Sequence, residues 1–388
     1  MGNKRTLKLK ISKTWLFSVT LGLFPLLNSY SAGLPSIDIG IAIVMLLFIV
    51  SFPRKLYRTS LNTLILYILF ITPVMVLISG KTDTSLTLII LRYLKMLLIL
   101  MAVFPFGLYQ RYFDERIVIK AARVGVYINA LFIFIQTIAV LILNLRISNP
   151  LLGFAINDAY SIINYQEMRL FRPCGFFLEP AHMTTYCLSF LIYSLYCSDN
   201  KRDILITTIA ILCTGSGMGI VFLAVHMGLY TLYKTKHNPL KGFAIIAFSV
   251  LAILFIMRIP YIQAVIARFT TSNQQGGGNA IVARIGKGYQ IFAAQPLYIK
   301  IFGQGYGNVP VGYYLNGVTY CLITIGVAGL IIYYAFIIKM LIKHKGWKRY
   351  GMITIAILAI GSQIFTPASI AFYFTFFGEK SITQNANL

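Results

Sequence analysis

The chain has 388 residues, of which 58% are hydrophobic and only 11% are charged. A soluble domain averages about 25% charged residues, and no polar stretch here is long enough to build such a domain. The formal net charge is +24, but Lys and Arg fall in short clusters between apolar runs, as the positive-inside rule describes for membrane proteins. The composition therefore predicts an all-α integral membrane protein and argues against nucleic-acid binding.

Apolar runs of roughly 20 residues recur along the chain, and each predicts one transmembrane helix. In the first part of the chain these predicted helices cover about 14–31, 37–52, 61–79, 85–108 and 117–145. No small-residue cleavage site follows the first run, so we expect a membrane helix there and not a removed signal peptide. Further along, a helix begins near Pro180, and a tight helix pair turns at "TGSGMG". The remaining predicted helices are one over about 242–259, one before "KHKGWKR", and a last stretch of about 351–377 that is broken near Pro367.

Together these runs predict about twelve spans in a single polytopic domain over residues 1–388, with both ends in the cytoplasm. The basic segments between helices fall on one side, which is the predicted cytoplasmic side: "PRKLYR", "QRYFDER", "SDNKRD", "KTKHNPLK" and "KHKGWKR". Two long loops, about 145–179 and 260–311, fall on the other side. Long loops with Pro, Gly and charge are where binding and catalysis concentrate.

The chain offers little for metal chemistry. It has ten carboxylates and five cysteines, and neither set shows the close acidic pairs or Cys spacing of a metal site. Cys174 lies in the first long loop, where it is available as a free thiol. We therefore expect no metal and no cofactor.

The first long loop ends in "LFRPCGFFLEPAHMTTYC", residues 170–187, where a cation and a carboxylate stand in an apolar setting. The guanidinium of Arg172 is suited to bidentate binding of phosphate or carboxylate. Glu179 precedes Pro180, which favours the N-cap position of the next helix. Glu179 is then either a capping carboxylate or a general base, and His182, one turn further, is either a hydrogen-bonded helper or an alternative base.

Cations also lie within predicted spans. Arg92 and Lys95 share a helix face, and each costs about 2.5–3.5 kcal/mol at a helix centre. They either snorkel to the interface or face an internal cavity occupied by an anion. Arg123 lies near the start of its predicted helix and is interpreted as an interfacial snorkeller.

The second long loop carries further cations and a glycine-rich turn. A short amphipathic helix is predicted over residues 280–292, with Arg284 and Lys287 on one face, and Arg268 precedes it. The following "GQGYGN" contains Gly305 and Asn308. It follows no βαβ unit, so it is not a dinucleotide loop, but we expect a tight turn whose backbone amides are free to meet an anion.

These motifs resemble those of the Wzy-type polymerases, which join the repeat units of O-antigen and capsular polysaccharides. "FRPCGFFLEPAH" resembles the family's Arg-x-x-Gly-x-Phe-x-Glu-Pro signature, and "PLYIKIFGQGYGN" resembles the end of its second external loop. "CTGSGMG" is similar to a small-residue turn between two helices of that family. The resemblance covers roughly Leu145 to Asn308 and the overall pattern of spans.

The resemblance implies a metal-independent glycosyltransferase with a multi-span fold like that of the GT-C membrane enzymes. Such an enzyme moves a growing glycan from undecaprenyl diphosphate onto a lipid-linked repeat unit, outside the bacterial cytoplasmic membrane. Its implied partners are this lipid-linked oligosaccharide, membrane lipids, a chain-length regulator and a flippase. The related O-antigen ligases carry a functional His in the second loop, and this sequence has no His between His237 and His344, which favours the polymerase. A flippase or anion transporter and a purely structural membrane protein remain the alternatives.

Overall fold

The computed structural model is built from α-helices, and no β-strand occurs among the residues it describes. Those residues are 12–27, 113–149, 172–238, 280–305 and 315–361, together with the isolated positions 30, 43, 46, 87, 90, 91, 94, 151, 240, 242–244, 247, 258, 263, 308, 372, 373, 376 and 377. The helices are α1 (Lys13–Leu23), α5 (Glu115–Leu143), α7 (Pro180–Tyr193), α8 (Lys201–Cys213), α9 (Gly217–Lys234), α12 (Ala280–Ala293), α13 (Leu297–Phe302), α14 (Gly317–Lys343) and α15 (Trp347–Gly361), with a 3₁₀ turn η1 (Phe24–Leu27) and a π turn η3 (Ser194–Ser198).

Two of the described helices, α5 with 29 residues and α14 with 27 residues, are long and apolar enough to cross a membrane. At 1.5 Å per residue, each exceeds the roughly 30 Å of a bilayer core. One face of α5 exposes large apolar side chains at every third or fourth position: Val124, Ile128, Leu131, Ile135, Ile138 and Ile142. This spacing forms a continuous apolar stripe on the outside of the helix.

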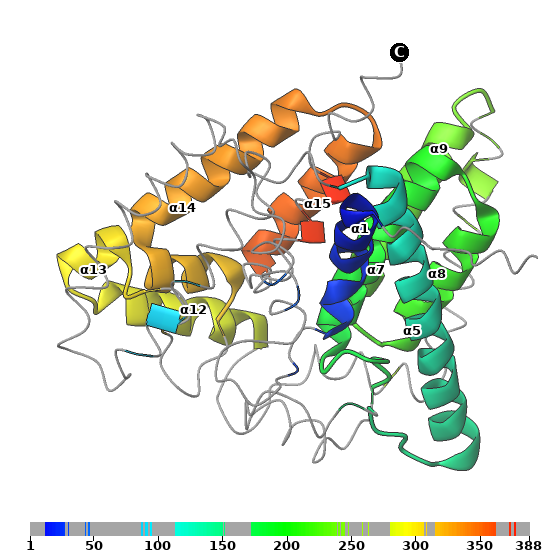
Figure 1. Ribbon diagram of the computed structural model, residues 1–388, viewed down its shortest axis with the longest axis horizontal. Helices are drawn as coiled ribbons and strands as arrows, with labels where there is room; N and C mark the ends of the chain where they lie inside the picture. Colours follow the sequence, from blue (N-terminus) through cyan, green and yellow to red (C-terminus); the bar gives the residue numbers. More distant parts are fainter. Residues whose placement is uncertain are drawn as a thin grey trace, which may run out of the picture.

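The opposite face of α5 is buried and lies against α1 and α7. Small residues let these helices approach closely: a Cβ added at Gly22 of α1 would lie 2.7 Å from the Cβ of Ala121. The hydroxyl of Tyr186 on α7 donates to the carbonyl of Gly22 at 2.8 Å. Figure 1 shows α1, α5 and α7 gathered on one side of the molecule, with α8 and α9 beside them.

Ion pairs join helix ends that lie far apart in the sequence. Glu115 at the start of α5 meets Lys348 at the start of α15, with 2.9 Å between Oε2 and Nζ. Asp203 in α8 is fully buried and meets Arg123 of α5 at 2.9 Å. The first pair connects "QRYFDER" with "KHKGWKR", two of the basic segments predicted to share one side, and the second connects "SDNKRD" with the first third of α5. In Figure 1 the start of α5 and the end of α14 lie in the upper part of the molecule, whereas α12 and α13 lie lower.

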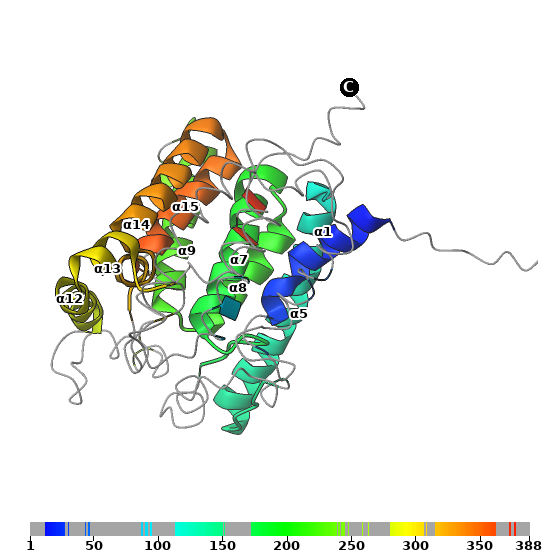
Figure 2. The same ribbon diagram turned by 60° about the vertical axis from the view of Figure 1, so that its left-hand side comes forward.

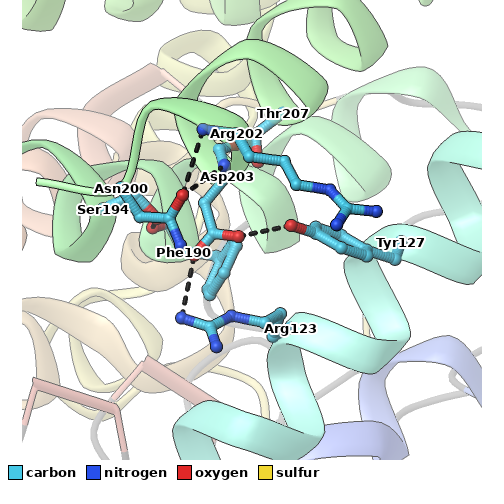
Figure 3. A network of polar contacts seen from close by, with 8 residues as sticks. All are labelled: Arg123, Tyr127, Phe190, Ser194, Asn200, Arg202, Asp203 and Thr207. Atoms are coloured by element: carbon cyan, nitrogen blue, oxygen red, sulfur yellow. Dashed lines mark hydrogen bonds and ion pairs between the residues drawn. The ribbon is translucent and has the colours of Figure 1, made fainter. Parts of the chain in front are cut away.

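Arg123, interpreted from the sequence as an interfacial snorkeller, has a side chain that is 35% exposed, and it also forms an ion pair that was not predicted. Figure 3 shows Arg123 and Tyr127 of α5 both pointing at the carboxylate of Asp203. The Tyr127 hydroxyl donates to Oδ1 of that carboxylate, and the guanidinium meets Oδ2. The charge of Arg123 is used inside the protein because it neutralises a carboxylate that water does not reach.

Several predicted elements are confirmed. A helix begins at Pro180, a tight turn separates α8 from α9 at the "TGSGMG" segment, and a helix covers residues 280–293. The predicted helix over 117–145 lies two residues earlier, and α15 begins at Trp347 and not near residue 351. The predicted spans over 37–52, 61–79 and 85–108 lie almost wholly outside the described residues. Of the predicted span over 242–259, only residues 242–244, 247 and 258 are described, and they define no continuous helix. The twelve-span arrangement therefore stays a prediction.

Candidate functional site

The first candidate site is the loop from Arg172 to Glu179, which leads directly into α7. Its proline residues bracket it: Pro173 and Pro180 are both buried. Glu179 is the N-cap residue of α7, with an extended backbone of φ −130° and ψ 138°, and Pro180 is the first helical residue. The chain is therefore forced out of the helical conformation at Glu179 and into it at Pro180.

Gly175 lets the loop turn tightly against α5. Its φ of +65° is in the left-handed region that favours glycine. A Cβ at this position would overlap the side-chain amide of Asn129 on α5. The turn is closed by a hydrogen bond from the Phe177 N–H to the Cys174 carbonyl at 3.1 Å.

Two buried amides of α5 receive the N–H groups of this loop. The Oε1 atom of Gln136 accepts from the N–H of Cys174 at 3.2 Å and of Gly175 at 2.9 Å. The Oδ1 atom of Asn129 accepts from the N–H of Phe176 at 2.8 Å. Three consecutive loop amides are thus satisfied by side chains of one helix, where water is excluded.

Phe176 is held from two further directions. Its carbonyl accepts a hydrogen bond from the hydroxyl of Tyr30, which in turn accepts from the side-chain amide of Asn149. Its ring lies 5.1 Å, between centroids, from that of Phe132 on α5. The loop therefore contacts α5 and Tyr30, and Tyr30 links it to Asn149.

Glu179 and His182 are both half-buried, and within the described part of the chain neither side chain makes a hydrogen bond or an ion pair. The predicted N-cap position of Glu179 is confirmed, but its side chain accepts no hydrogen bond from the helix, so the carboxylate can favour α7 only through the helix dipole. The carboxylate is left for another use. The assignments of Glu179 and His182 as base and helper stay predictions.

The charges of Arg172 and Glu179 both affect the pKa of the Cys174 thiol. This thiol is free and fully buried. Burial raises its pKa to about 12, the Arg172 guanidinium lowers that pKa, and the Glu179 carboxylate raises it. A half-buried cation and a half-buried carboxylate thus stand at the two ends of a single short loop, and both act on the same buried thiol.

The second predicted group of residues lies on α12 and in the turn after α13. Lys287 is exposed on α12, and Arg284 belongs to the same helix. Arg268 lies outside the described residues, as do Arg92 and Lys95. Their predicted roles are untested.

The glycine-rich turn differs from the prediction at its described residues, because the backbone amides of Gln304, Gly305 and Asn308 are not free. The N–H of Gln304 donates to the Ile323 carbonyl at 2.8 Å, and the N–H of Gly305 to the Thr324 carbonyl at 3.0 Å. The N–H of Asn308 donates to Gly305 at 3.1 Å. The backbone N–H groups of Gly305 and Asn308 therefore already donate to carbonyls of the protein, and an anion would have to displace these hydrogen bonds.

The carbonyls that receive these amides come from a break in α14. The backbone at Gly326 is non-helical, with φ 68° and ψ −176°, so the carbonyls just before it lose their partners in the helix. The backbone N–H groups of Gln304 and Gly305 in the turn donate to these carbonyls. In this structure the turn therefore satisfies the carbonyls left unpaired by the break in α14.

The two groups of predicted residues lie apart. α7 packs against α5, α8, α9 and α15, whereas α12 and α13 pack against α14. Figures 1 and 2 agree that α12 lies on the far side of the molecule from α5. The structure thus groups Arg172, Glu179 and His182, and separately Lys287, Arg284 and the glycine turn.

Four residues that hold the first loop were not predicted from the sequence: Tyr30, Asn129, Gln136 and Asn149. Asn129 and Gln136 left a readable signal, since they are the polar residues of "INALFIFIQ" and lie two helical turns apart on one face. Tyr30 and Asn149 carried no pattern that distinguishes them from ordinary loop residues.

The sequence matches no protein-family model, and no curated protein shows significant similarity to it.

Proposed function

We propose that this chain is a membrane polysaccharide polymerase. It transfers a growing glycan from undecaprenyl diphosphate to a lipid-linked repeat unit, on the outer face of the bacterial cytoplasmic membrane. The proposal includes about twelve spans, with both ends and the basic segments in the cytoplasm.

The observation that supports it best is the construction of the loop from Arg172 to Glu179. A cation and a carboxylate stand half-buried at its two ends, the carboxylate makes no hydrogen bond or ion pair with any described residue, and buried side chains hold the backbone between them. The same residues carry the resemblance to the Wzy-type polymerases. A helix cap or a solvated surface charge requires none of this fixation.

The reaction needs both charges. The bond between the anomeric carbon and the diphosphate oxygen breaks, and negative charge develops on the leaving diphosphate. Arg172 stabilises that charge, joined by Arg268, Arg284 and Lys287 if the second loop closes over the same substrate. Glu179 takes the proton from the acceptor hydroxyl as it attacks, and His182 is the alternative base one turn along α7.

Substitution Glu179→Gln tests the proposal, with glycan ladders made by a deletion strain that carries the variant gene. Because the Glu179 side chain does not cap α7, the variant keeps its fold and we expect normal accumulation. Gln cannot accept the proton, so polymerisation falls about 10²–10⁴-fold. The matched control is Asp199→Asn, which changes an exposed carboxylate bound to Lys234 and leaves the ladder normal.

A normal ladder from Glu179→Gln contradicts the assignment of the base and moves it to His182. The deletion strain itself separates enzyme from transporter. Loss of a polymerase leaves single repeat units on the surface lipid, whereas loss of a flippase leaves none there.

A further inference from the structure

Asn129 and Gln136 are an unusual pair for an apolar helix. Both side chains have no exposed surface, and both lie on the buried face of α5 among Ala130 and Ile133. A buried amide is unfavourable unless its polar atoms are bonded. Packing alone is served better by Leu or Met at either position, so the two amides need another explanation.

Their acceptor oxygens are both given to the loop of the candidate site. Oε1 of Gln136 takes two loop amides and Oδ1 of Asn129 takes the next. The loop has no strand or helix to pair these groups, so without the two side chains they are buried and unsatisfied. Gln136 also donates through Nε2 to the Ile147 carbonyl at 3.1 Å, which ties the chain after α5 to the same point.

The fixed segment is the middle of the loop, between Arg172 and Glu179. Gly175 lies against Asn129 with no room for a Cβ, so the loop cannot shift toward α5. It cannot move away without losing three hydrogen bonds. The separation between the two charged ends is therefore set by α5.

We propose that Asn129 and Gln136 are positioning residues: they hold the loop so that Arg172 and Glu179 keep one spacing during glycan transfer. The catalytic part of this inference rests on the function proposed above. The structural part is that these amides hold the loop against α5 and so keep its residue Cys174 buried. This part is tested separately.

The variants are chosen to separate the effect of losing the hydrogen-bond acceptor from the effect of changing the size of the side chain. Gln136→Met keeps the length but loses the acceptor, whereas Gln136→Glu keeps an acceptor oxygen whether or not it is protonated. Asn129→Leu and Asn129→Asp form the same pair at the other position. Thr137→Val is the control, because among the described residues the Thr137 hydroxyl bonds to the Ile133 carbonyl of its own helix and to the Cys213 thiol of α8, and not to the loop.

The first readout is the rate at which a maleimide labels Cys174 in the purified full-length protein, followed by peptide mapping. Cys174 is fully buried in the parent. In Gln136→Met and Asn129→Leu we expect its labelling to rise about tenfold or more, because the loop opens more often. In Gln136→Glu and Thr137→Val it stays near the parent rate. Cys187 and Cys321 are buried in other helices and must stay protected, which excludes general unfolding.

The second readout is the glycan ladder at matched protein level. The inference predicts a lost or shortened ladder for Gln136→Met and rescue by Gln136→Glu. It is overturned if Cys174 stays protected in Gln136→Met, or if Cys174 opens while the ladder stays normal. Failure of the proposed function is a different result: Glu179→Gln then gives a normal ladder, whatever happens to the labelling of Cys174.

Discussion

The carboxylate of Asp203 shows how this chain handles a charge where water is excluded. Its side chain is fully buried, and it is neutralised by Arg123 and bonded by the hydroxyl of Tyr127. Its own backbone N–H donates to Asn200 at 3.3 Å, the N-cap of α8. The arrangement ties α5 to the start of α8 through one charged side chain.

Breaking this pair from the cationic side is expected to be costly. Arg123→Leu leaves Asp203 buried without its countercharge. Breaking a fully buried pair costs about 3–5 kcal/mol, and we expect a smaller loss here because the Arg123 side chain is 35% exposed. The double variant Arg123→Leu with Asp203→Asn removes the stranded charge but keeps an acceptor for Tyr127, so it recovers part of the loss. Melting temperatures in detergent measure both. Arg116→Leu, an exposed position of the same helix, is the control, and a melting temperature of Arg123→Leu equal to that of the control contradicts the role of the pair.

The sequence predicted the charged residues of the candidate loop but not their support. Arg172 and Glu179 stand out because charge is rare in this chain and Pro180 marks the helix start. The ion pair of Arg123 was not predicted because its partner, Asp203, lies 80 positions along the chain, and periodicity carries no information on such pairing. Asn129 and Gln136 were passed over because a polar residue in an apolar helix has many possible causes until its partner is known.

At the scale of elements, the break in α14 and the turn after α13 pack closely against each other through their backbones. Gly303 and Gly326 both adopt positive φ with ψ near 180°, at φ 81°, ψ 175° and φ 68°, ψ −176°. That region of backbone space is essentially restricted to glycine. Each glycine also lies against the backbone of the other segment, so neither position has space for a side chain.

Gly326→Ala is therefore expected to destabilise the protein. The backbone conformation alone costs about 1–3 kcal/mol for a residue with a Cβ, and the added atom overlaps the carbonyl of Ile301. Gly286→Ala is the matched control, because a Cβ there meets nothing within 4 Å, and in a helix it gains about 0.5–1 kcal/mol. Thermal melting in detergent should separate the two variants in opposite directions. Equal melting temperatures would mean that the α14 break is dispensable.

The helix boundaries that were predicted correctly are those with a local chemical signal. Pro180 favours the first position of a helix, and "TGSGMG" interrupts an apolar run. The break at Gly326 was missed, since it lies in the uninterrupted apolar segment "GVTYCLITIGVAGLIIYYAF". Its cause is the docking of a distant turn, which no local pattern reports.

At the scale of the whole molecule, the ion pairs between helices and the charged loop of the candidate site lie at different ends of the helices. The ion pairs of Glu115 with Lys348 and of Asp199 with Lys234 join segments that the sequence assigns to the cytoplasmic side, and Asp203, the partner of Arg123, belongs to another such segment. The first loop, by contrast, begins α7 at its other end. In Figure 2 the start of α5 again lies toward the top, and α12 and α13 lie lower. If the proposal is correct, the end with the ion pairs faces the cytoplasm and the loop of the candidate site faces out.

Site-directed labelling tests this orientation with an impermeant maleimide. Cys197, in η3, is the exposed member of the five cysteines, and it lies beside "SDNKRD", so we expect labelling in inside-out vesicles and not in intact cells. Leu297→Cys, at the start of α13, introduces a thiol where the side chain is 73% exposed; in a Cys197→Ser background it should label in intact cells. Both expectations follow from the segregation of Lys and Arg. Labelling of Cys197 from outside would place the basic end outside and the Arg172–Glu179 loop in the cytoplasm, and a polymerase working on the outer face would then be ruled out.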